Sequence, residues 1–480
     1  MNNQALPTLS LLSIEQVDAI QETSLRILAK VGFKIQYPEV FQMLEGTPGV
    51  TVRPDTSTVQ FSPELVMDSV AQTPKTYSLY GRDQTHCVTY GRGEMIFKNT
   101  PGDPFWADAE TKTWRPPTIQ DTRRGIDLAD ALPNINIVGA MADPADIPEP
   151  VRYICQMAEL VKRTRKPIRT WVPDRASARY MVEILKTTVG GTDELRRHPM
   201  TEHSLEPISP LRVGTGLGAM LEFAEAGLPI MIGPIVQAMA TGPVTLAGTV
   251  AQTIAEALAC LVIVQRAKPG HPVCLAAACH IMDPRTMHTV YGGPEQGLLM
   301  AATTQVIKSL GLPATANAGY GDSKVPDVQV GLEKGMTLLM GALAGADSFG
   351  QMGVAGTLGA SLLQLVVDDE MVGYVRRLMR GMALTDEDLA FDVIQRVGIG
   401  GDFLSDEHTV RHLRQEFWIP SLFDRHPHTQ WLEAGGKTML QRAREKLDRI
   451  TDSHEPDWME ESRQREVDCI VAAAEKELLS

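Results

Sequence analysis

One feature of this sequence constrains the fold more than any other: from about Gln120, short apolar runs alternate with helical segments. Each run ends in polar or glycine-rich residues, which is typical of strands buried on both faces of a parallel sheet. The runs that predict strands are Ile135–Ala142, Ile168–Val172, Glu206–Val213, Ile230–Val236, Val273–His280, Ala314–Gly319, Asp347–Gly353 and, less clearly because it could be helical, Leu363–Val367. The segments between them that predict helices include Val151–Thr164, Ala176–Thr188, Val244–Ala267 and Glu295–Leu310.

Roughly eight such units in one chain favour a closed α/β architecture, the (β/α)8 TIM barrel, over an open sheet. An open doubly wound sheet is the alternative. Its dinucleotide-binding form is disfavoured because no G-x-G-x-x-G motif follows an early strand. We therefore expect the barrel to occupy residues 119–383 of the 480.

The regions on either side of the predicted barrel have a different pattern of apolar and polar residues. Apolar residues at helical spacing follow Ser13, a plausible N-cap with Gln16 at the capping-box position, and β-like segments separated by glycines lie between Tyr77 and Phe97. Residues 1–118 are thus expected to form an α+β cap. Residues 384–480 are polar and helical, and end in two charged amphipathic segments, Met439–Arg449 and Trp458–Leu479. They predict a C-terminal helical extension packed on the barrel.

Charge and composition exclude several classes of protein. The net charge of -14 argues against nucleic acid as a partner, because phosphate binding needs clustered Lys and Arg. It is compatible with a cationic substrate, although most acidic surfaces serve solubility. The N-terminus lacks the plan of a signal peptide, and every apolar run is broken well short of about 20 residues, so no membrane span and a cytoplasmic location are expected.

The cysteines and glycines do not indicate a metal or nucleotide site. None of the six cysteines forms a C-x-x-C pair, which predicts free thiols in a reducing compartment. Cys274 and Cys279 lie near His280, but they fall on opposite faces of an extended strand, so convergent zinc ligation is disfavoured. The glycine-rich segment 214–218 has no Lys-Ser/Thr after it and is better explained as a tight turn.

In a barrel, functional residues lie where strands end and the following loops begin. The loops after the predicted fifth, sixth and seventh strands hold amides, aromatic rings and a few charges, which suit a small polar ligand. Arg285 and Lys324 are the cations that could bind a carboxylate on that ligand, although both residue types are more often surface charges. The candidate residues are His280, Arg285, Tyr320, Asp322, Phe349 and Gln351.

The segment 99–108 is also informative, because only 5% of the chain is aromatic. It places Phe105 and Trp106 beside Asp103 and Asp108 in a loop rich in Pro and Gly. A quaternary ammonium has no N–H to donate and is bound by ring faces and diffuse negative charge. Trp106 and Asp103 are therefore candidate substrate-binding residues, against the alternative of a structural turn with Trp106 in the core. The ammonium is expected among Trp106, Tyr320 and Phe349.

Several segments along nearly the whole chain resemble one family. The chain is similar to the trimethylamine methyltransferase superfamily, specifically to members without pyrrolysine, which include glycine betaine methyltransferases. The segments that carry the resemblance are ETSLRILAKVGFKI near the start, ISPLRV at 208–213, ATGPVTLAGTVAQTIAEALA at 240–259, KVPDVQVGLEKGMTLLMGALAGAD at 324–347, LVVDDEMVGYVRRLMRG at 365–381, HTVRHLRQEFWIPSLFDR at 408–425 and QWLEAGG at 430–436.

The resemblance implies a (β/α)8 barrel and methyl transfer to the cob(I)alamin state of a small, separate corrinoid protein. Relatives that contain pyrrolysine use it to activate trimethylamine, and this sequence holds no nonstandard residue. A quaternary amine needs no such activation, because its leaving group is already a neutral tertiary amine. The implied substrate is thus a small quaternary amine such as a betaine, with no tightly bound cofactor or metal and Asp322 as the catalytic candidate. We also expect a homo-oligomer.

Two other functions are compatible with the sequence. A zinc-dependent barrel methyltransferase acting on a thiol would carry stoichiometric zinc. A non-catalytic quaternary-amine binding protein would bind its ligand tightly without turnover beside a corrinoid protein. The absence of a nucleophile or catalytic dyad favours methyl transfer, since in-line displacement depends mainly on positioning.

Overall fold

The computed structural model describes residues 4–108, 111–356 and 358–480. It is an α/β fold built on parallel strands. The largest sheet has the order β12 (His203–Leu205), β14 (Ile230–Ile232), β16 (Val273–Ala277), β19 (Ala314–Asn317), β20 (Ser348–Met352) and β7 (Ile96–Asn99). A second parallel pair consists of β10 (Val138–Gly139) and β11 (Ile168–Arg169).

Backbone contacts connect this pair to both edges of the larger sheet. Lys98 in β7 forms a parallel bridge with Ile137, beside β10. On the other side, the Ile168 amide in β11 donates to the carbonyl of Met200, which precedes β12, at 3.0 Å. All four residues of β7 and all five of β16 are buried. Burial on both faces explains why most of these strands read as apolar runs.

A layer of helices covers the outside of the strands. Each helix packs on the next in chain order, and the last packs back on the first. They are α4 (Ile119–Ala131), α5 (Glu149–Arg163), α6 (Arg175–Val189), α8 (Gly216–Ala226), α9 (Leu246–Ala267), α10 (Pro294–Ser309), α11 (Val328–Leu343) and α12 (Leu362–Met379). Within the described residues, α9 alone is long and apolar enough to cross a membrane, and 89% of its most apolar window is buried inside the fold.

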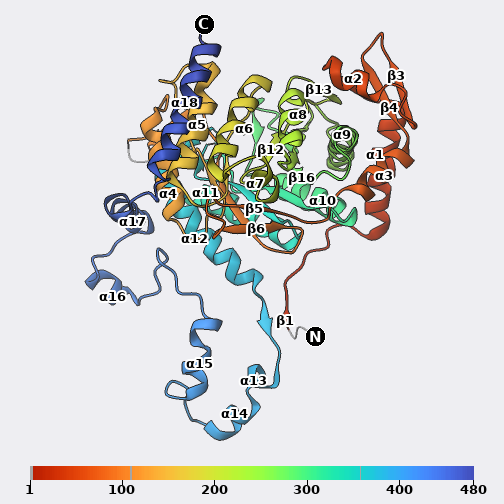
Figure 1. The fold of residues 1–480 in the computed structure, drawn as a ribbon. Helices are drawn as coiled ribbons and strands as arrows, with labels where there is room; N and C mark the ends of the chain where they lie inside the picture. The colour runs from red at the N-terminus through yellow and green to blue at the C-terminus, as the bar shows by residue number, and fades with distance from the viewer. Residues whose placement is uncertain (1–3, 109–110, 357) are drawn as a thin grey trace.

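The N-terminal region lies on one flank, beside α9 (Figure 1). Ser13 caps its first helix as predicted: the Ser13 hydroxyl accepts from the Gln16 amide, and the Gln16 side chain accepts from the Ser13 amide. The elements of this flank are α1 (Ile14–Lys30), β2 (Phe33–Ile35), α2 (Pro38–Leu44), β3 (Val50–Arg53), β4 (Thr58–Phe61), α3 (Pro63–Gln72) and β13 (Arg212–Val213). A separate hairpin pairs β5 (Tyr77–Tyr80) with β6 (Cys87–Tyr90).

Two small sheets follow the carboxyl ends of the parallel strands, the end at which the sites of α/β barrels lie. One has the order β21 (Val354–Ala355), β22 (Gly359–Ala360), β8 (Phe105–Asp108) and β9 (Thr113–Arg115). The other consists of β15 (Gln237–Ala238), β17 (His280–Met282) and β18 (Thr289–Val290).

The C-terminal region begins after β23 (Met382–Ala383), which pairs with β1 (Gln4–Ala5). Its two charged helices pack on the body of the fold: α17 (Met439–Ser453) on α12 and α4, and α18 (Glu461–Leu478) on α5 and α6. The shorter helices are α7 (Thr192–Arg197), which precedes β12, and then α13 (Asp386–Leu389), α14 (Phe391–Val397), α15 (Glu407–Glu416) and α16 (His428–Glu433).

Three strand assignments from the sequence differ from the structure. The strand predicted at Glu206–Val213 is wrong, because β12 ends at Leu205 and the prolines at 207 and 210 interrupt the run. The unclear run Leu363–Val367 is helical and lies in α12. The third difference is β7, which belongs to the parallel sheet but was not predicted as a barrel strand. Its four residues include a lysine and lie before residue 119, where we predicted the barrel to begin. That boundary therefore excludes a strand that belongs to the sheet.

Candidate active site

A cavity lies at the carboxyl ends of the parallel strands. The space inside it has a volume of about 60 Å³. Residues from β7, β11, β14, β16, β19, β20 and the loops that follow the strands contribute to its wall. The residues that line it are Lys98, Arg169, Trp171, Glu206, Met231, Gly233, Ile235, Ala276, Ala278, Thr315, Ala316, Asn317, Tyr320, Gly350 and Gln351. We refer to it as the central cavity.

Arg169 brings a buried guanidinium to the central cavity. It is the last residue of β11, and its side chain is only 7% exposed. Its Nη1 has no hydrogen-bond partner among the described residues. Gly350 leaves room for it, because a Cβ at that position would stand 2.9 Å from Arg169 Nη1. Burial lowers the pKa of Arg169, but an arginine remains charged in proteins. The free N–H groups can therefore donate to an anionic group of a ligand.

Glu206 supplies a carboxylate to the same cavity. It follows β12 directly, at the strand end where α/β sites form. Its side chain is exposed toward the cavity, while the protein atoms around the cavity still desolvate its carboxyl group in part. This desolvation raises the pKa of Glu206 to about 7, although a hydrogen bond from Ser204 and the charge of Arg169 oppose the shift. Near neutral pH the group thus carries a partial negative charge.

Aromatic rings form another part of the site. Tyr320 and Trp171 line the central cavity, and the Trp171 indole N–H donates to the carbonyl of Gly102 at 2.9 Å. The ring of Tyr291 lies 4.5 Å from that of Tyr320, measured between centroids. The ring of His280 lies 4.4 Å from Tyr291 on its other side. A row of rings therefore leads from the cavity wall toward β17.

Three of the predicted residues join this arrangement beside Tyr320. Gln351 lines the cavity, and its Oε1 has no hydrogen-bond partner among the described residues. His280 is fully buried and accepts a hydrogen bond at Nε2 from the Asn317 amide at 3.0 Å. Burial lowers the pKa of His280 to about 4, so the ring is neutral and does not repel a cation. Burial likewise raises the pKa of Asp103 to about 7, and Asp103 interacts electrostatically with Tyr320 and Tyr291.

The floor of the cavity is a buried ion pair. Lys98 Nζ lies 3.0 Å from Glu202 Oε1, and both side chains are almost fully buried. The hydroxyls of Tyr77 and Tyr90 also donate to Glu202, at 2.7 and 3.1 Å. Because its charge is matched and its hydrogen bonds are made, this cluster is a structural base for the cavity.

Two of the predicted aromatic residues lie elsewhere. Phe349 is fully buried, stacks on Phe97 at 4.8 Å and faces α11 at Gly341, because it points to the opposite side of β20 from its neighbour Gly350. Trp106 lies in the small sheet that follows β7, and the Arg115 guanidinium lies 6.0 Å from its ring. Neither residue lines the central cavity, so the prediction that they form the cage with Tyr320 does not fit this geometry.

The charged residues predicted at the mouth lie in an outer hollow next to the cavity. Arg285 is highly exposed and pairs with Asp283 at 2.8 Å, so it does not face the cavity. Asp322 accepts from the backbone amides of Tyr291 and Gly292, at 3.1 and 2.9 Å. Lys324 donates to the Asp322 carbonyl at 2.6 Å. Asp322 thus fixes the backbone that carries Tyr291.

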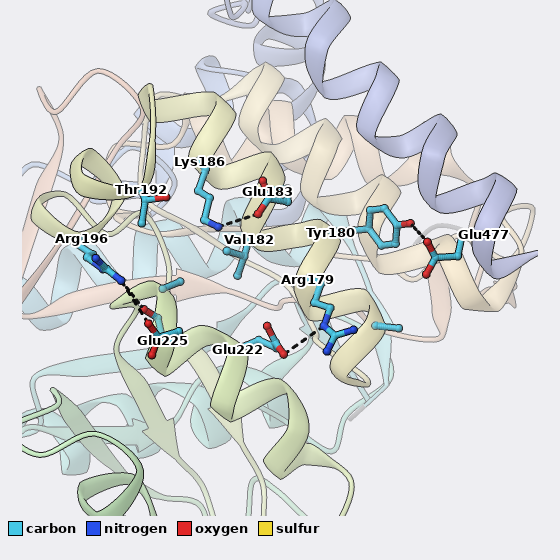
Figure 2. Close-up of a pocket in the computed structure, with 12 residues that line it drawn as sticks. Arg179, Tyr180, Val182, Glu183, Lys186, Thr192, Arg196, Glu222, Glu225 and Glu477 are labelled. Atoms are coloured by element: carbon cyan, nitrogen blue, oxygen red, sulfur yellow. Dashed lines mark hydrogen bonds and ion pairs between the residues drawn. The ribbon is translucent and has the colours of Figure 1, made fainter.

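A second hollow lies outside the helical layer, between α6, α7, α8 and α18 (Figure 2). Its charges pair with one another: Arg179 with Glu222, Lys186 with Glu183, and Arg196 with Glu225. The Tyr180 hydroxyl donates to Glu477 at 2.7 Å. Because these charges are matched, this hollow offers little to a charged ligand. Within the described parts of the chain, no group of three or more His, Cys, Asp or Glu side chains is placed to hold a metal ion.

Arg169, Glu206, Trp171 and Tyr291 were not predicted as site residues. Arg169 and Trp171 fall inside a predicted buried strand, and a charge in such a strand is the signal that could have identified Arg169. Glu206 was placed at the start of the predicted strand Glu206–Val213, because that strand was predicted too late in the chain, whereas β12 ends at Leu205. Tyr291 follows β18, a short strand that no periodicity indicated.

Comparison with known proteins gives a consistent result over the full length. Residues 1–478 match the family model described as trimethylamine methyltransferase (MTTB). A glycine betaine methyltransferase of Desulfitobacterium hafniense strain Y51 is 30% identical over 488 aligned positions, which cover 99% of each chain. A trimethylamine methyltransferase MttB of Desulfitobacterium hafniense strain DSM 10664 / DCB-2 is 30% identical, covering 97% of this chain and 94% of the relative.

One solved structure shares the fold at low sequence identity. The crystal structure of the Methanosarcina barkeri monomethylamine methyltransferase MtmB superposes with a TM-score of 0.55 and 11% identity, covering 93% of this chain and 89% of that one. This similarity supports the α/β architecture and carries no information about the substrate.

Proposed function

The chain belongs to the trimethylamine methyltransferase (MTTB) family, and from this premise we propose that it demethylates a small quaternary amine that bears a carboxylate. The methyl acceptor is the cobalt(I) corrinoid of a separate protein, as the family resemblance implies. The enzyme acts in the cytoplasm and holds no resident cofactor of its own.

The observation that carries this proposal is the pairing of opposite charges across the central cavity. Arg169 offers free N–H donors in a buried wall, whereas Glu206 and the rings of Tyr320 and Trp171 suit an ammonium without N–H groups. A betaine-like molecule carries both complementary groups. Arg169 thus takes the carboxylate-binding role that the sequence suggested for Arg285 or Lys324.

The geometry also suits the chemistry of the transfer. The C–N bond breaks as the C–Co bond forms; its electron pair stays on nitrogen, and cobalt supplies the pair for the new bond. No proton moves, so the site needs positioning more than acid–base groups. The cation loses its charge in the transition state, and a full carboxylate cage would hold it back. The raised pKa of Glu206 keeps that negative charge modest.

We further infer that the strands close into a (β/α)8 barrel, with β7 as its first strand. The bridge from Lys98 to Ile137, the hydrogen bond from Ile168 to Met200, and the closed ring of helices support this inference. The central cavity then lies at the mouth, where barrel enzymes carry their sites.

Turnover tests the proposal. Free cob(I)alamin should be methylated, as followed by absorbance, with at least one of glycine betaine, carnitine or proline betaine, whereas turnover of choline alone would argue against a carboxylate on the substrate. Trimethylamine should be inactive, because the chain has no residue to activate it. Efficient turnover of trimethylamine, or no turnover of any quaternary amine, would contradict the proposal.

The role of Arg169 has a matched control. Arg169→Gln should weaken binding of the carboxylate substrate in calorimetry by roughly 10- to 150-fold, since a charged hydrogen bond contributes about 1.5–3 kcal/mol. Binding of choline, which has no carboxylate, should change little. Arg285→Gln should leave both ligands unaffected. Equal losses for choline and betaine in Arg169→Gln would show that Arg169 does not bind the carboxylate.

A further inference from the structure

The chain displays two apolar surfaces that the described residues do not cover. The first is a segment that we call the arm, residues 384–417, which includes α13, α14 and α15. None of these helices buries a residue. Figure 1 shows the arm extending away from the body of the protein. Six of its large apolar side chains are exposed by 55% to 86%: Leu389, Phe391, Ile394, Leu404, Val410 and Phe417.

The second surface is a groove between α11 and α12, of about 270 Å³. Almost all of its lining is apolar. Its side chains Leu332, Met336, Tyr374 and Leu378 are exposed by 42% to 66%. Together the arm and the groove form a concentration of exposed apolar residues that a monomeric protein rarely shows.

The arm lies away from the active site. A helix that follows a parallel strand runs back along it, so the last residues of α12 lie at the amino ends of the strands. The arm leaves from that end, directly after β23. The central cavity is at the carboxyl ends. A corrinoid protein must present its cobalt to the cavity, and the arm is therefore poorly placed to receive it.

We propose that the arm of one copy of this chain seats in the α11–α12 groove of a second copy, and that the exchange is reciprocal. Helices as short as those of the arm are not stable alone in water and need a packed partner. The chain itself supplies both an apolar arm and an apolar groove, which is what a closed twofold interface requires. The pairing of β1 with β23 anchors the base of the arm and sets its direction.

The available area approaches that of a stable assembly. A fully exposed large apolar side chain offers roughly 60–120 Å², and the ten side chains named above are on average about 60% exposed, so they offer on the order of 350–750 Å² per copy. A standard stable interface buries about 800 Å² per partner.

The first test measures mass in solution, by sedimentation or light scattering over a dilution series. Wild type should be a dimer or a higher even assembly at micromolar concentration. The double variant Phe391→Asp, Leu404→Asp should dissociate at concentrations at least 100-fold higher, with unchanged circular dichroism. Ile14→Asp is the control, because Ile14 is 78% exposed at the start of α1, on the other flank. A monomeric wild type, or an arm variant that keeps the assembly, would overturn the proposal.

The second test asks which surface the arm contacts. In a background of Cys87→Ser and Cys469→Ser, one copy carries Leu404→Cys and a differently tagged copy carries Met336→Cys. A short bifunctional thiol reagent should link the two tagged chains. A third variant carries both cysteines in one chain. If that variant is linked only within one monomer, or if no link forms between the two tagged chains while the assembly persists, the proposal fails. Neither readout depends on turnover, so its failure leaves the proposed methyl transfer intact.

Discussion

At the residue scale, the candidate site contains groups of opposite charge that differ in how fully they are ionised. Arg169 is a buried full charge, whereas Glu206 and Asp103 are carboxyl groups whose pKa values burial raises to about 7. Under the proposed function, a quaternary ammonium in this cavity would meet aromatic rings and the partly ionised carboxyl group of Glu206. That balance would allow the cation to bind without being held so firmly that the loss of its charge becomes costly.

Substrate binding should therefore depend on pH. Raising the pH from 6 to 8 ionises Glu206, and the anion attracts the ammonium, so affinity measured by calorimetry should increase by about tenfold, or 1.4 kcal/mol. Glu206→Gln should bind more weakly at pH 8 and lose most of this dependence. Asp103→Asn tests the second carboxyl group. A wild-type profile that is flat between pH 6 and 8 would remove both groups from cation binding.

Asp322 should act by positioning. Its carboxylate holds the backbone of Tyr291 and Gly292, so Asp322→Ala should displace the Tyr291 ring and raise KM by roughly five- to thirtyfold, which is the contribution of one ring to cation binding. The loss of stability should be smaller than the loss of activity. Lys324→Met is the control on the same loop and should change KM little. Wild-type kinetics in Asp322→Ala would exclude it from the site.

Residue-level reasoning selected Tyr320, Gln351 and His280 because they lie at or near the ends of predicted strands, and in the structure Tyr320 and Gln351 line the central cavity while His280 contacts Tyr291. It misplaced Phe349 because the ring and the cavity lie on opposite faces of one strand, and a one-residue shift changes the face. Arg285 was selected as a carboxylate-binding residue by its charge alone. The sequence does not show whether an arginine is exposed or buried, because burial depends on how the strands pair.

At the element scale, α11 and α12 are joined by a buried ion pair. Lys334 Nζ lies 2.7 Å from Asp368 Oδ2, and both side chains are fully buried. Asp368 also accepts from the Gly353 amide and from Gln364, both at 2.7 Å. This network fixes the loop after β20 to the start of α12, and so helps to position the wall that carries Gly350 and Gln351.

Breaking that pair should destabilise the protein. Asp368→Ala leaves a buried ammonium without a partner, which costs about 3–5 kcal/mol. For a chain of this length the expected decrease in Tm is about 3–5 °C. Replacing both partners, Lys334→Met with Asp368→Leu, should restore much of the loss. A single variant with an unchanged Tm would contradict this account of the contact.

The elements that sequence patterns predicted well are long or uniformly apolar. The 22 residues of α9 and the buried run in β16 match their predicted positions closely. The strand β7 was missed because it is four residues long and contains Lys98, whose charge Glu202 satisfies only after folding. No local pattern carries that information, since the partner is more than 100 residues away.

At the scale of the whole molecule, the proposed active site and the proposed assembly arm lie at opposite ends of the parallel strands. The central cavity opens at the carboxyl ends of the strands, and the arm leaves from the amino ends. An assembly held by arms would leave each cavity free to meet a corrinoid protein. The sequence indicated the family and the α/β class, but the arm was grouped with the solvated C-terminal helices, because composition does not distinguish an unpaired apolar face from a packed one.

Transfer of an isotopic label tests the central claim most directly. The enzyme is mixed with cob(I)alamin and glycine betaine that carries three deuterated methyl groups, and the products are analysed by mass spectrometry. We predict deuterated methylcobalamin together with dimethylglycine that keeps its other two deuterated methyls, in about equal amounts. Loss of the betaine without label on cobalt, or methylcobalamin without dimethylglycine, would show that the methyl group does not pass from nitrogen to cobalt in this site.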